Sequence, residues 1–142
     1  MARMADARRM YGGDKVTTTP ERLITMLYDR MVRDLVAAEQ AIERGDREAS
    51  HRELTHAQEI VVELLAALDV DKWSGAAQLR QLYAWVLQQL FHANVEQDVE
   101  LVQHCRKMIE PLAEAWHVAA AQVTRGAIQR NLQPTTILGA AV

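Results

Sequence analysis

Apolar residues recur at helical spacing along most of the chain, in four long stretches separated by short polar segments. The first begins at Thr19-Pro20-Glu21, where a hydroxyl that can cap a helix precedes a proline suited to the first helical position. It ends near Gly45, which can adopt the left-handed stop, and Asp46 can cap the next helix. The later stretches span about 47–70, 74–95 and 98–126, and Ser74 and Asp98 can cap the third and fourth helices. We therefore expect an all-α, antiparallel up-down-up-down four-helix bundle.

Each predicted helix has one apolar face, found by stepping about 100° per residue. In the first helix this face comprises Ile24, Leu27, Tyr28, Met31, Leu35, Ala38 and Ile42. In the second it comprises Leu54, Ala57, Val61, Leu64, Leu65 and Leu68, and in the third Leu79, Leu82, Tyr83, Val86, Leu90 and Ala93. In the fourth it comprises Leu101, Val102, Cys105, Ile109, Leu112, Trp116, Ala120 and Val123. Pro111 removes one backbone hydrogen bond inside the fourth helix and predicts a kink near Lys107.

The ends of the chain lack this periodicity. Residues 1–18 contain Gly12-Gly13 and few apolar side chains, so we expect a mobile N-terminal segment. Pro134 interrupts any helix beyond Gly126. The predicted organisation is a mobile segment over 1–18, a bundle over 19–126 and a short C-terminal tail over 127–142.

Two helices carry more apolar side chains than one core-facing side can hold. In the first helix the additional residues are Leu23, Met26, Val32 and Val36, and in the third they are Trp85, Leu87 and Phe91. Arg80 is the only charged residue between Ser74 and Val95. Because a monomer seldom exposes contiguous apolar surface without a use for it, we expect a partner to cover these side chains. A homo-oligomeric bundle without catalytic activity, with subunit interfaces in these places, is the alternative.

Composition narrows the class of protein. Hydrophobic residues make up 49% and charged residues 25%, an ordinary globular balance. The formal charge of −3 gives no basic field for nucleic acid. No stretch approaches the roughly 20 apolar residues of a membrane span, and no apolar run follows the N-terminal arginines, so we expect a cytoplasmic protein without membrane insertion. The single cysteine, Cys105, is interpreted as a small core residue.

Helical bundles often hold di-iron sites that are built with Glu-x-x-His motifs. The chain has three such motifs, at Glu48…His51, Glu53…His56 and Glu114…His117. The third helix lacks an acidic residue, and Asp29, Asp34 and Glu39 of the first helix miss its central line. We interpret these groups as solvated polar faces, and His92 and His104 as surface or boundary residues. No phosphate loop, nucleophile elbow or metal-binding cysteine pair is present, so we expect no catalytic residue, metal or cofactor.

Five motifs in order resemble the FliS family of flagellin-specific export chaperones. The first helix opens with Thr17-Thr18-Thr19-Pro20-Glu21-Arg22-Leu23-Ile24-Thr25-Met26-Leu27-Tyr28-Asp29, which is similar to the family pattern T-A-x-P-x-x-L-I-x-M-L-Y-D. The others are Ala38…Ala41-Ile42-Glu43, His56-Ala57-Gln58-Glu59-Ile60-Val61-x-Glu63-Leu64, Leu79-x-x-Leu82-Tyr83-Ala84-Trp85 with Leu90-x-x-Ala93-Asn94, and Glu114-Ala115-Trp116. The resemblance covers about residues 11 to 120 and is collinear throughout.

The resemblance implies a specific function. Such chaperones bind the disordered C-terminal segment of new flagellin one to one, prevent premature polymerisation and deliver the subunit to the flagellar type III export gate. The implied flagellin groove comprises Leu23, Met26, Leu27, Val32, Val36, Trp85, Leu87 and Phe91. The resemblance also implies a displaceable lid, for which the candidates are Met10, Tyr11 and Val16. It leaves open whether a flagellar regulator or an export-gate component shares the site.

Overall fold

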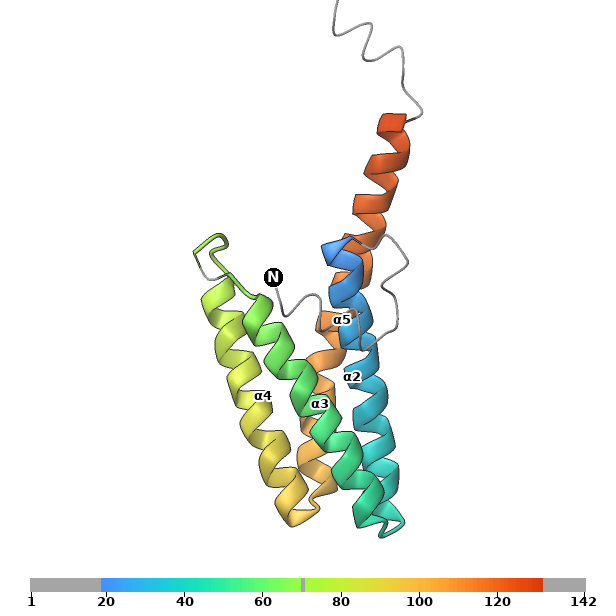
Figure 1. Cartoon of the computed structure of the whole chain (residues 1–142), viewed down its shortest axis with the longest axis vertical. Helices are drawn as coiled ribbons and strands as arrows, with labels where there is room; N and C mark the ends of the chain where they lie inside the picture. Colours follow the sequence, from blue (N-terminus) through green and yellow to red (C-terminus); the bar gives the residue numbers. More distant parts are fainter. Residues whose placement is uncertain (1–18, 70, 132–142) are drawn as a thin grey trace, which may run out of the picture.

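The computed structural model describes residues 19–69 and 71–131. It contains helices α2 (Pro20–Glu43), α3 (Arg47–Ala67), α4 (Ala76–Glu96) and α5 (Val99–Asn131). The described residues include no β-strand, and the predicted all-α four-helix bundle is confirmed. Successive helices alternate in direction, and the C-terminal end of α5 projects beyond the other three (Figure 1). The proposed lid residues Met10, Tyr11 and Val16 lie outside the described residues.

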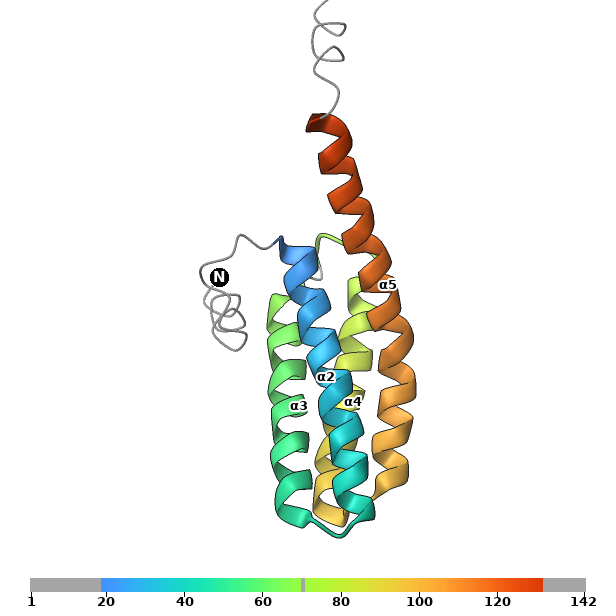
Figure 2. The ribbon, with the colours of Figure 1, turned by 90° about the vertical axis from the view of Figure 1, so that its right-hand side faces the viewer.

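The helices close into a ring in which each has two neighbours. Helix α2 packs against α3 and α5, and α4 packs against the same two helices (Figure 2). Helices α2 and α4 are therefore diagonal partners. This arrangement decides which apolar rows can share a surface, because rows on diagonal helices face different sides of the molecule.

Three predicted helix caps are confirmed. The Thr19 hydroxyl oxygen accepts a hydrogen bond of 3.2 Å from a backbone N–H of the first turn of α2. Asp46 accepts one of 3.0 Å at the start of α3, and Asp98 one of 3.0 Å at the start of α5. Gly45, with φ of 74°, provides the left-handed stop after α2. Such side-chain acceptors satisfy backbone donors that have no partner within the helix.

The start of α4 differs from the prediction. Ser74 was expected to cap this helix, but the capping position is Gly75 and no side chain makes a capping hydrogen bond. The indole of Trp73 folds over Gly75, and a Cβ atom built there would lie 2.8 Å from the ring. A side chain at this position would therefore have to displace the exposed indole, and a backbone turn from Trp73 to Ala76 precedes the helix where the serine cap was expected.

Two other helix ends also differ. Helix α3 ends at Ala67 instead of near residue 70, because Asp69 accepts a hydrogen bond of 3.1 Å from the backbone N–H of Asp71 and forms a turn. Helix α5 continues through Pro111 and past Gly126 to Asn131. A glycine costs only about 1 kcal/mol inside a helix, so it does not have to end one.

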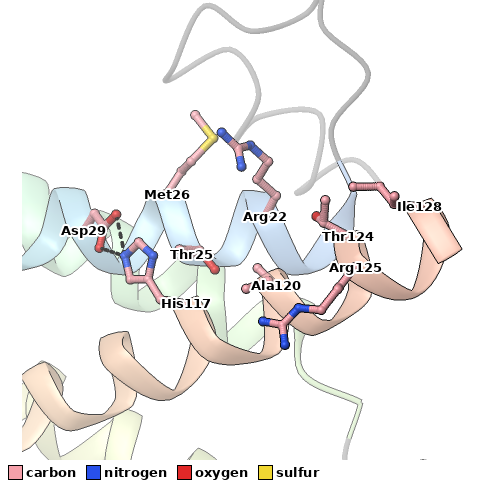
Figure 3. Close-up of a pocket in the computed structure, with 10 residues that line it drawn as sticks. Arg22, Thr25, Met26, Asp29, His117, Ala120, Thr124, Arg125 and Ile128 are labelled. Carbon is pink, nitrogen blue, oxygen red and sulfur yellow. Dashed lines mark hydrogen bonds and ion pairs between the residues drawn. The ribbon is translucent and has the colours of Figure 1, made fainter.

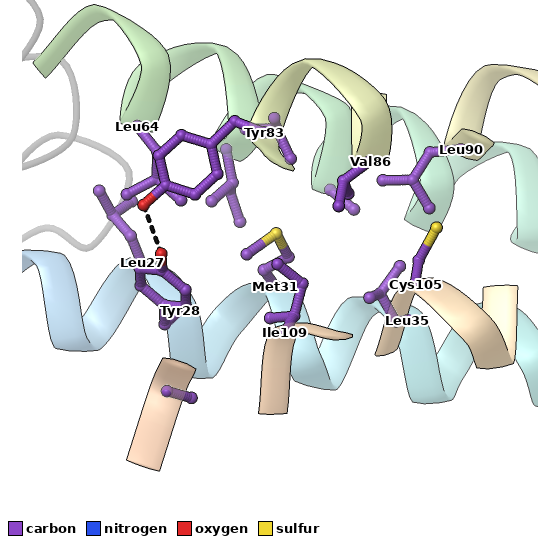
Figure 4. Packing of buried hydrophobic residues seen from close by; sticks show 14 of the residues in the cluster. Leu27, Tyr28, Met31, Leu35, Leu64, Tyr83, Val86, Leu90, Cys105 and Ile109 are labelled. Atoms are coloured by element: carbon purple, nitrogen blue, oxygen red, sulfur yellow. Dashed lines mark hydrogen bonds between the residues drawn. The ribbon is translucent and has the colours of Figure 1, made fainter. Parts of the chain in front are cut away.

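The predicted apolar faces form the core except at the C-terminal end of α5, where Val123 was expected to face inward but is 39% exposed, because α5 projects beyond the other helices there. Figure 4 shows Met31 and Leu35 of α2 packed with Val86 and Leu90 of α4 and Ile109 of α5. All five side chains are fully buried. Ile24, Ile42, Leu65, Leu68, Leu82, Leu101, Leu112 and Trp116 are partly buried against this cluster. Of the additional apolar residues, Leu23 belongs to this core and Val32, Trp85 and Leu87 pack against it, whereas Val36 and Phe91 are exposed.

Two tyrosines cross the core between the diagonal helices. The hydroxyls of Tyr28 and Tyr83 share a hydrogen bond, shown as a dashed line in Figure 4. Trp116 packs against Tyr28 with ring centroids 6.3 Å apart. Burial raises the pKa of both tyrosines, so each hydroxyl stays protonated and each has a partner. These aromatic side chains stabilise the bundle from inside.

Candidate functional site

A groove runs between α2 and the C-terminal half of α5. One part has a volume of about 510 Å³ and includes Met26 and Asp29 of α2 with His117, Arg125 and Ile128 of α5 in its lining (Figure 3). A second part of about 660 Å³ shares Asp29 and His117 and continues along the same two helices. The shared residues make these two parts of one groove. Small residues of α5, including Ala120 and Ala121, line it and leave room against α2.

A hydrogen-bonded pair crosses this groove. His117 Nε2 lies 2.8 Å from Asp29 Oδ1 and 3.0 Å from Oδ2, and Figure 3 shows the two side chains meeting between the helices. The side chains are 55% and 44% exposed. Exposed ion pairs contribute at most about 1 kcal/mol, so this bridge can open at little cost.

Asp34 lies buried on the side of α2 that faces α3, with 2% of its surface exposed. It accepts a hydrogen bond of 3.0 Å from Arg30 and contacts His56 Nδ1 of α3. Burial raises the pKa of Asp34, and the hydrogen bonds and charges of His56 and Arg30 oppose that increase. The contact between Asp34 and His56 fixes α3 against α2.

Glu39 forms the corresponding link from α2 to α5. It is 7% exposed and accepts a hydrogen bond of 3.0 Å from Arg106, which also contacts Glu110 at 3.2 Å. The hydrogen bond to Glu39 raises the pKa of Arg106, with a further contribution from Glu110. The interpretation of Asp34 and Glu39 as solvated was wrong, because both are buried and hydrogen-bonded to partners on neighbouring helices, His56 of α3 and Arg106 of α5.

The predicted groove residues of α2 fall into two groups. Leu23 and Leu27 are 2% and 1% exposed, so they belong to the core and their assignment to an open groove was wrong. The N-terminal half of α2 is covered on two sides, and this buries a wider arc than one apolar face. Met26 and Val32 are partly buried and line the groove beside α5, whereas Val36 is 37% exposed.

The predicted residues of α4 lie elsewhere. Phe91 is 58% exposed and lines a shallow pocket of about 350 Å³ beside α3. Trp85 is partly buried and meets His104 of α5 edge to face, with ring centroids 5.2 Å apart. Leu87 is partly buried against the core. The α4 row is thus not continuous with Met26 and Val32, because α2 and α4 are diagonal.

Sequence reasoning missed several exposed apolar side chains, and two of them line pockets beside α4. Val95 is 59% exposed and lines the same pocket as Phe91; its position four residues after Phe91 was a usable signal. Trp73 is 54% exposed and lines an apolar groove of about 360 Å³ with Leu79, Leu112 and Trp116. That groove joins the turn before α4 to α5, and the apolar pattern within one helix gives no sign of it.

The histidines of the three Glu-x-x-His motifs have other partners. His51 Nδ1 lies 2.8 Å from the side-chain amide nitrogen of Asn94, His56 contacts Asp34, and His117 contacts Asp29. Over residues 19–69 and 71–131, no three His, Cys, Asp or Glu side chains gather as metal ligands would. Burial raises the pKa of the Cys105 thiol to about 12, so it stays protonated inside the core.

None of the described helices combines the length and apolar character that crossing a bilayer requires.

The sequence matches known proteins over most of its length. The family described as "Flagellar protein FliS" matches residues 4–123. The flagellar secretion chaperone FliS of Salmonella typhimurium is 32% identical over 103 residues, which cover 71% of this chain and 76% of that protein. The FliS proteins of Bacillus subtilis and Campylobacter jejuni are 29% identical over 103 residues and 31% over 99, covering 72% and 69% of this chain and 77% of each relative. The chain belongs to the FliS family of flagellar secretion chaperones.

Proposed function

We propose that this protein is a cytoplasmic, non-catalytic export chaperone that binds the disordered C-terminal region of flagellin in its surface grooves. One chaperone binds one flagellin, prevents premature polymerisation and promotes flagellar type III export. A component of the export gate or a flagellar regulator is a further candidate partner.

The observation that carries this proposal is apolar side chains left exposed beside a complete core. Phe91 and Val95 are more than half exposed on α4, and Met26 and Val32 line the groove between α2 and α5. An amphipathic client helix places its apolar side chains into such a groove. In a family of secretion chaperones, a client is the expected partner of this surface.

The energetics fit a transient complex. A disordered client must become ordered when it binds, and this costs part of the interaction energy. Several separate apolar surfaces can together bury enough area to offset that cost. Because the contacts are distributed and ordering of the client lowers the net binding free energy, the complex can form and still release its client at export.

The test is titration with the C-terminal peptide, about forty residues long, of the flagellin encoded in the same genome. Circular dichroism should show added helix, and light scattering should give a complex of one chaperone and one peptide. Phe91→Asp should weaken binding at least about tenfold, because an apolar contact is replaced by a charge. Gln81→Asp, an exposed polar position on α4, is the control and should bind normally.

If the peptide shows no binding at concentrations of tens of micromolar, at about which weak specific complexes are still detected, the proposal is overturned. Self-association that Phe91→Asp abolishes, with no peptide binding, would favour the homo-oligomeric bundle instead. The melting temperature of Phe91→Asp should stay close to that of the wild type, since exposed substitutions change stability by about 0.5 kcal/mol or less.

A further inference from the structure

We propose that the part of the α2–α5 groove between Arg22 and the Asp29–His117 bridge binds an acidic, amphipathic segment of the client, with Arg22 and Arg125 contacting its carboxylates. This inference rests on the proposed function and specifies the chemistry of one bound segment. It is independent of the apolar contacts of Phe91, which lies on a different side of the bundle.

The groove is shaped for a helix or an extended strand of chain. Helix α2 provides one wall and α5 the other, and Arg22 and Arg125 extend from these opposite walls (Figure 3). Ala120 and Ala121 let a backbone approach α5 closely. Ile128 is 51% exposed and Met26 is partly buried, so the lining offers apolar contacts between the charged groups.

The charges of the lining select an acidic partner. Among the described residues, no carboxylate lies within ion-pair distance of the guanidinium of Arg22 or Arg125. By contrast, Arg30 and Arg106 each pair with a carboxylate. Of the described residues that line this part of the groove, only Asp29 is a carboxylate, and both of its oxygens are hydrogen-bonded to His117. An incoming segment therefore meets two positive charges at the arginines, and the one carboxylate is already occupied by a donor.

The bridge also marks where this segment ends. Arg33, Glu110 and Glu114 line the part of the groove beyond Asp29 and His117, where charges of both signs are present. A segment with carboxylates gains most by staying on the side of the two arginines. Because these charges are exposed, their contribution is modest, depends on salt and sets selectivity more than total affinity.

The experiment compares Arg22→Gln/Arg125→Gln with wild type, using the cognate flagellin C-terminal peptide and the same peptide with every Asp and Glu changed to the amide. Arg80→Gln/Lys107→Gln is the matched control, because it removes two exposed positive charges outside the groove. At low salt the groove variant should bind the natural peptide about fivefold to tenfold more weakly, and the control should match wild type. The difference should shrink at high salt and disappear with the amide peptide.

Each alternative result has a distinct meaning. If the natural peptide binds the groove variant as tightly as it binds wild type, this inference is wrong and the proposed function stands. If the control variant loses as much affinity for the peptide as the groove variant, the effect is one of overall charge, and this inference is also wrong. If the groove variant binds the peptide more tightly than wild type, the arginines hold a segment of the chaperone's own chain. If wild type forms a dimer that the groove variant does not form, the arginines hold a second copy of the chain. Either result would exclude an acidic client segment at this site. If the peptide fails to bind wild type, the proposed function is what fails.

Discussion

Helices α2 and α4 occupy diagonal positions in one bundle but are built differently. Helix α2 buries two carboxyl groups, those of Asp34 and Glu39, and pairs them with His56 of α3 and Arg106 of α5. Every buried residue of α4 is apolar or aromatic, and this helix exposes Phe91 and Val95. Paired charges tie α2 to both of its neighbours, whereas α4 is held mainly by apolar contacts.

This difference between α2 and α4 suggests different roles for the two helices: one specifies how the helices assemble, and the other provides surface for a partner. A buried ion pair favours one arrangement of helices, because any other arrangement leaves a charge without its partner. Apolar contacts are less directional, so exposed apolar side chains can pack against a foreign chain as well as against their own. We infer that α2 defines the frame of the bundle and α4 contributes adaptable surface.

The largest expected effect comes from placing a charge in the frame. Leu35→Asp puts a carboxylate at a fully buried position of α2, and should cost about 4 kcal/mol or more, enough to unfold a domain of ordinary stability. Val36→Asp is the matched control one residue along, where the side chain is 37% exposed. Urea denaturation followed by circular dichroism compares the two. Equal losses would show that the burial assigned to this face of α2 is wrong.

A smaller effect should follow from breaking the link between α2 and α5. Arg106→Met leaves Glu39 buried without its cation, at an expected cost of about 2–4 kcal/mol in the free energy of unfolding. Adding Glu39→Met should recover most of that stability, because an apolar pair needs no compensation. Denaturation of the single and double variants measures the coupling. A single variant as stable as wild type would contradict the structural importance of this pair.

Periodicity was enough to predict the fold because each helix has a regular apolar face, and three of the four begin at a side chain that caps them. It failed where a second neighbour decides burial. Leu23 is off the central face of α2, yet two flanking helices cover it. Asp34 and Glu39 looked solvated because their partners, His56 and Arg106, lie on other helices and far away in the sequence.

The candidate site shows the same division. The exposure of Phe91 was predictable, because its direction on α4 depends only on helical spacing. The groove that brings Arg22 and Arg125 together depends on how α2 and α5 pack, and neither helix alone indicates it. Side-chain direction within a helix can be read from a sequence, whereas surfaces shared by two helices require their relative placement.

The smallest expected effect is a pH dependence of stability that comes from the carboxyl group of Asp34. It tests whether α2 accommodates a buried carboxyl group or is stabilised by its charge. Burial raises the pKa of Asp34, so the folded chain holds a proton there at pH values where the unfolded chain has lost it. This contribution to stability is fully present below the unfolded pKa and is lost as the pH rises through the folded pKa. Asp34→Asn removes the titration. The stability of wild type relative to this variant should therefore increase as the pH falls through the acidic range.

Urea denaturation of both proteins at a series of acidic pH values measures this difference, with Asp29→Asn as a control at a half-exposed carboxylate. The comparison between variants cancels the titration of the other carboxylates, which both proteins share. The opposite trend, in which wild type loses stability relative to Asp34→Asn as the pH falls, would mean that pairing with Arg30 and His56 outweighs desolvation. In that case Asp34 would stabilise the frame through its charge, instead of being a charge that the frame accommodates.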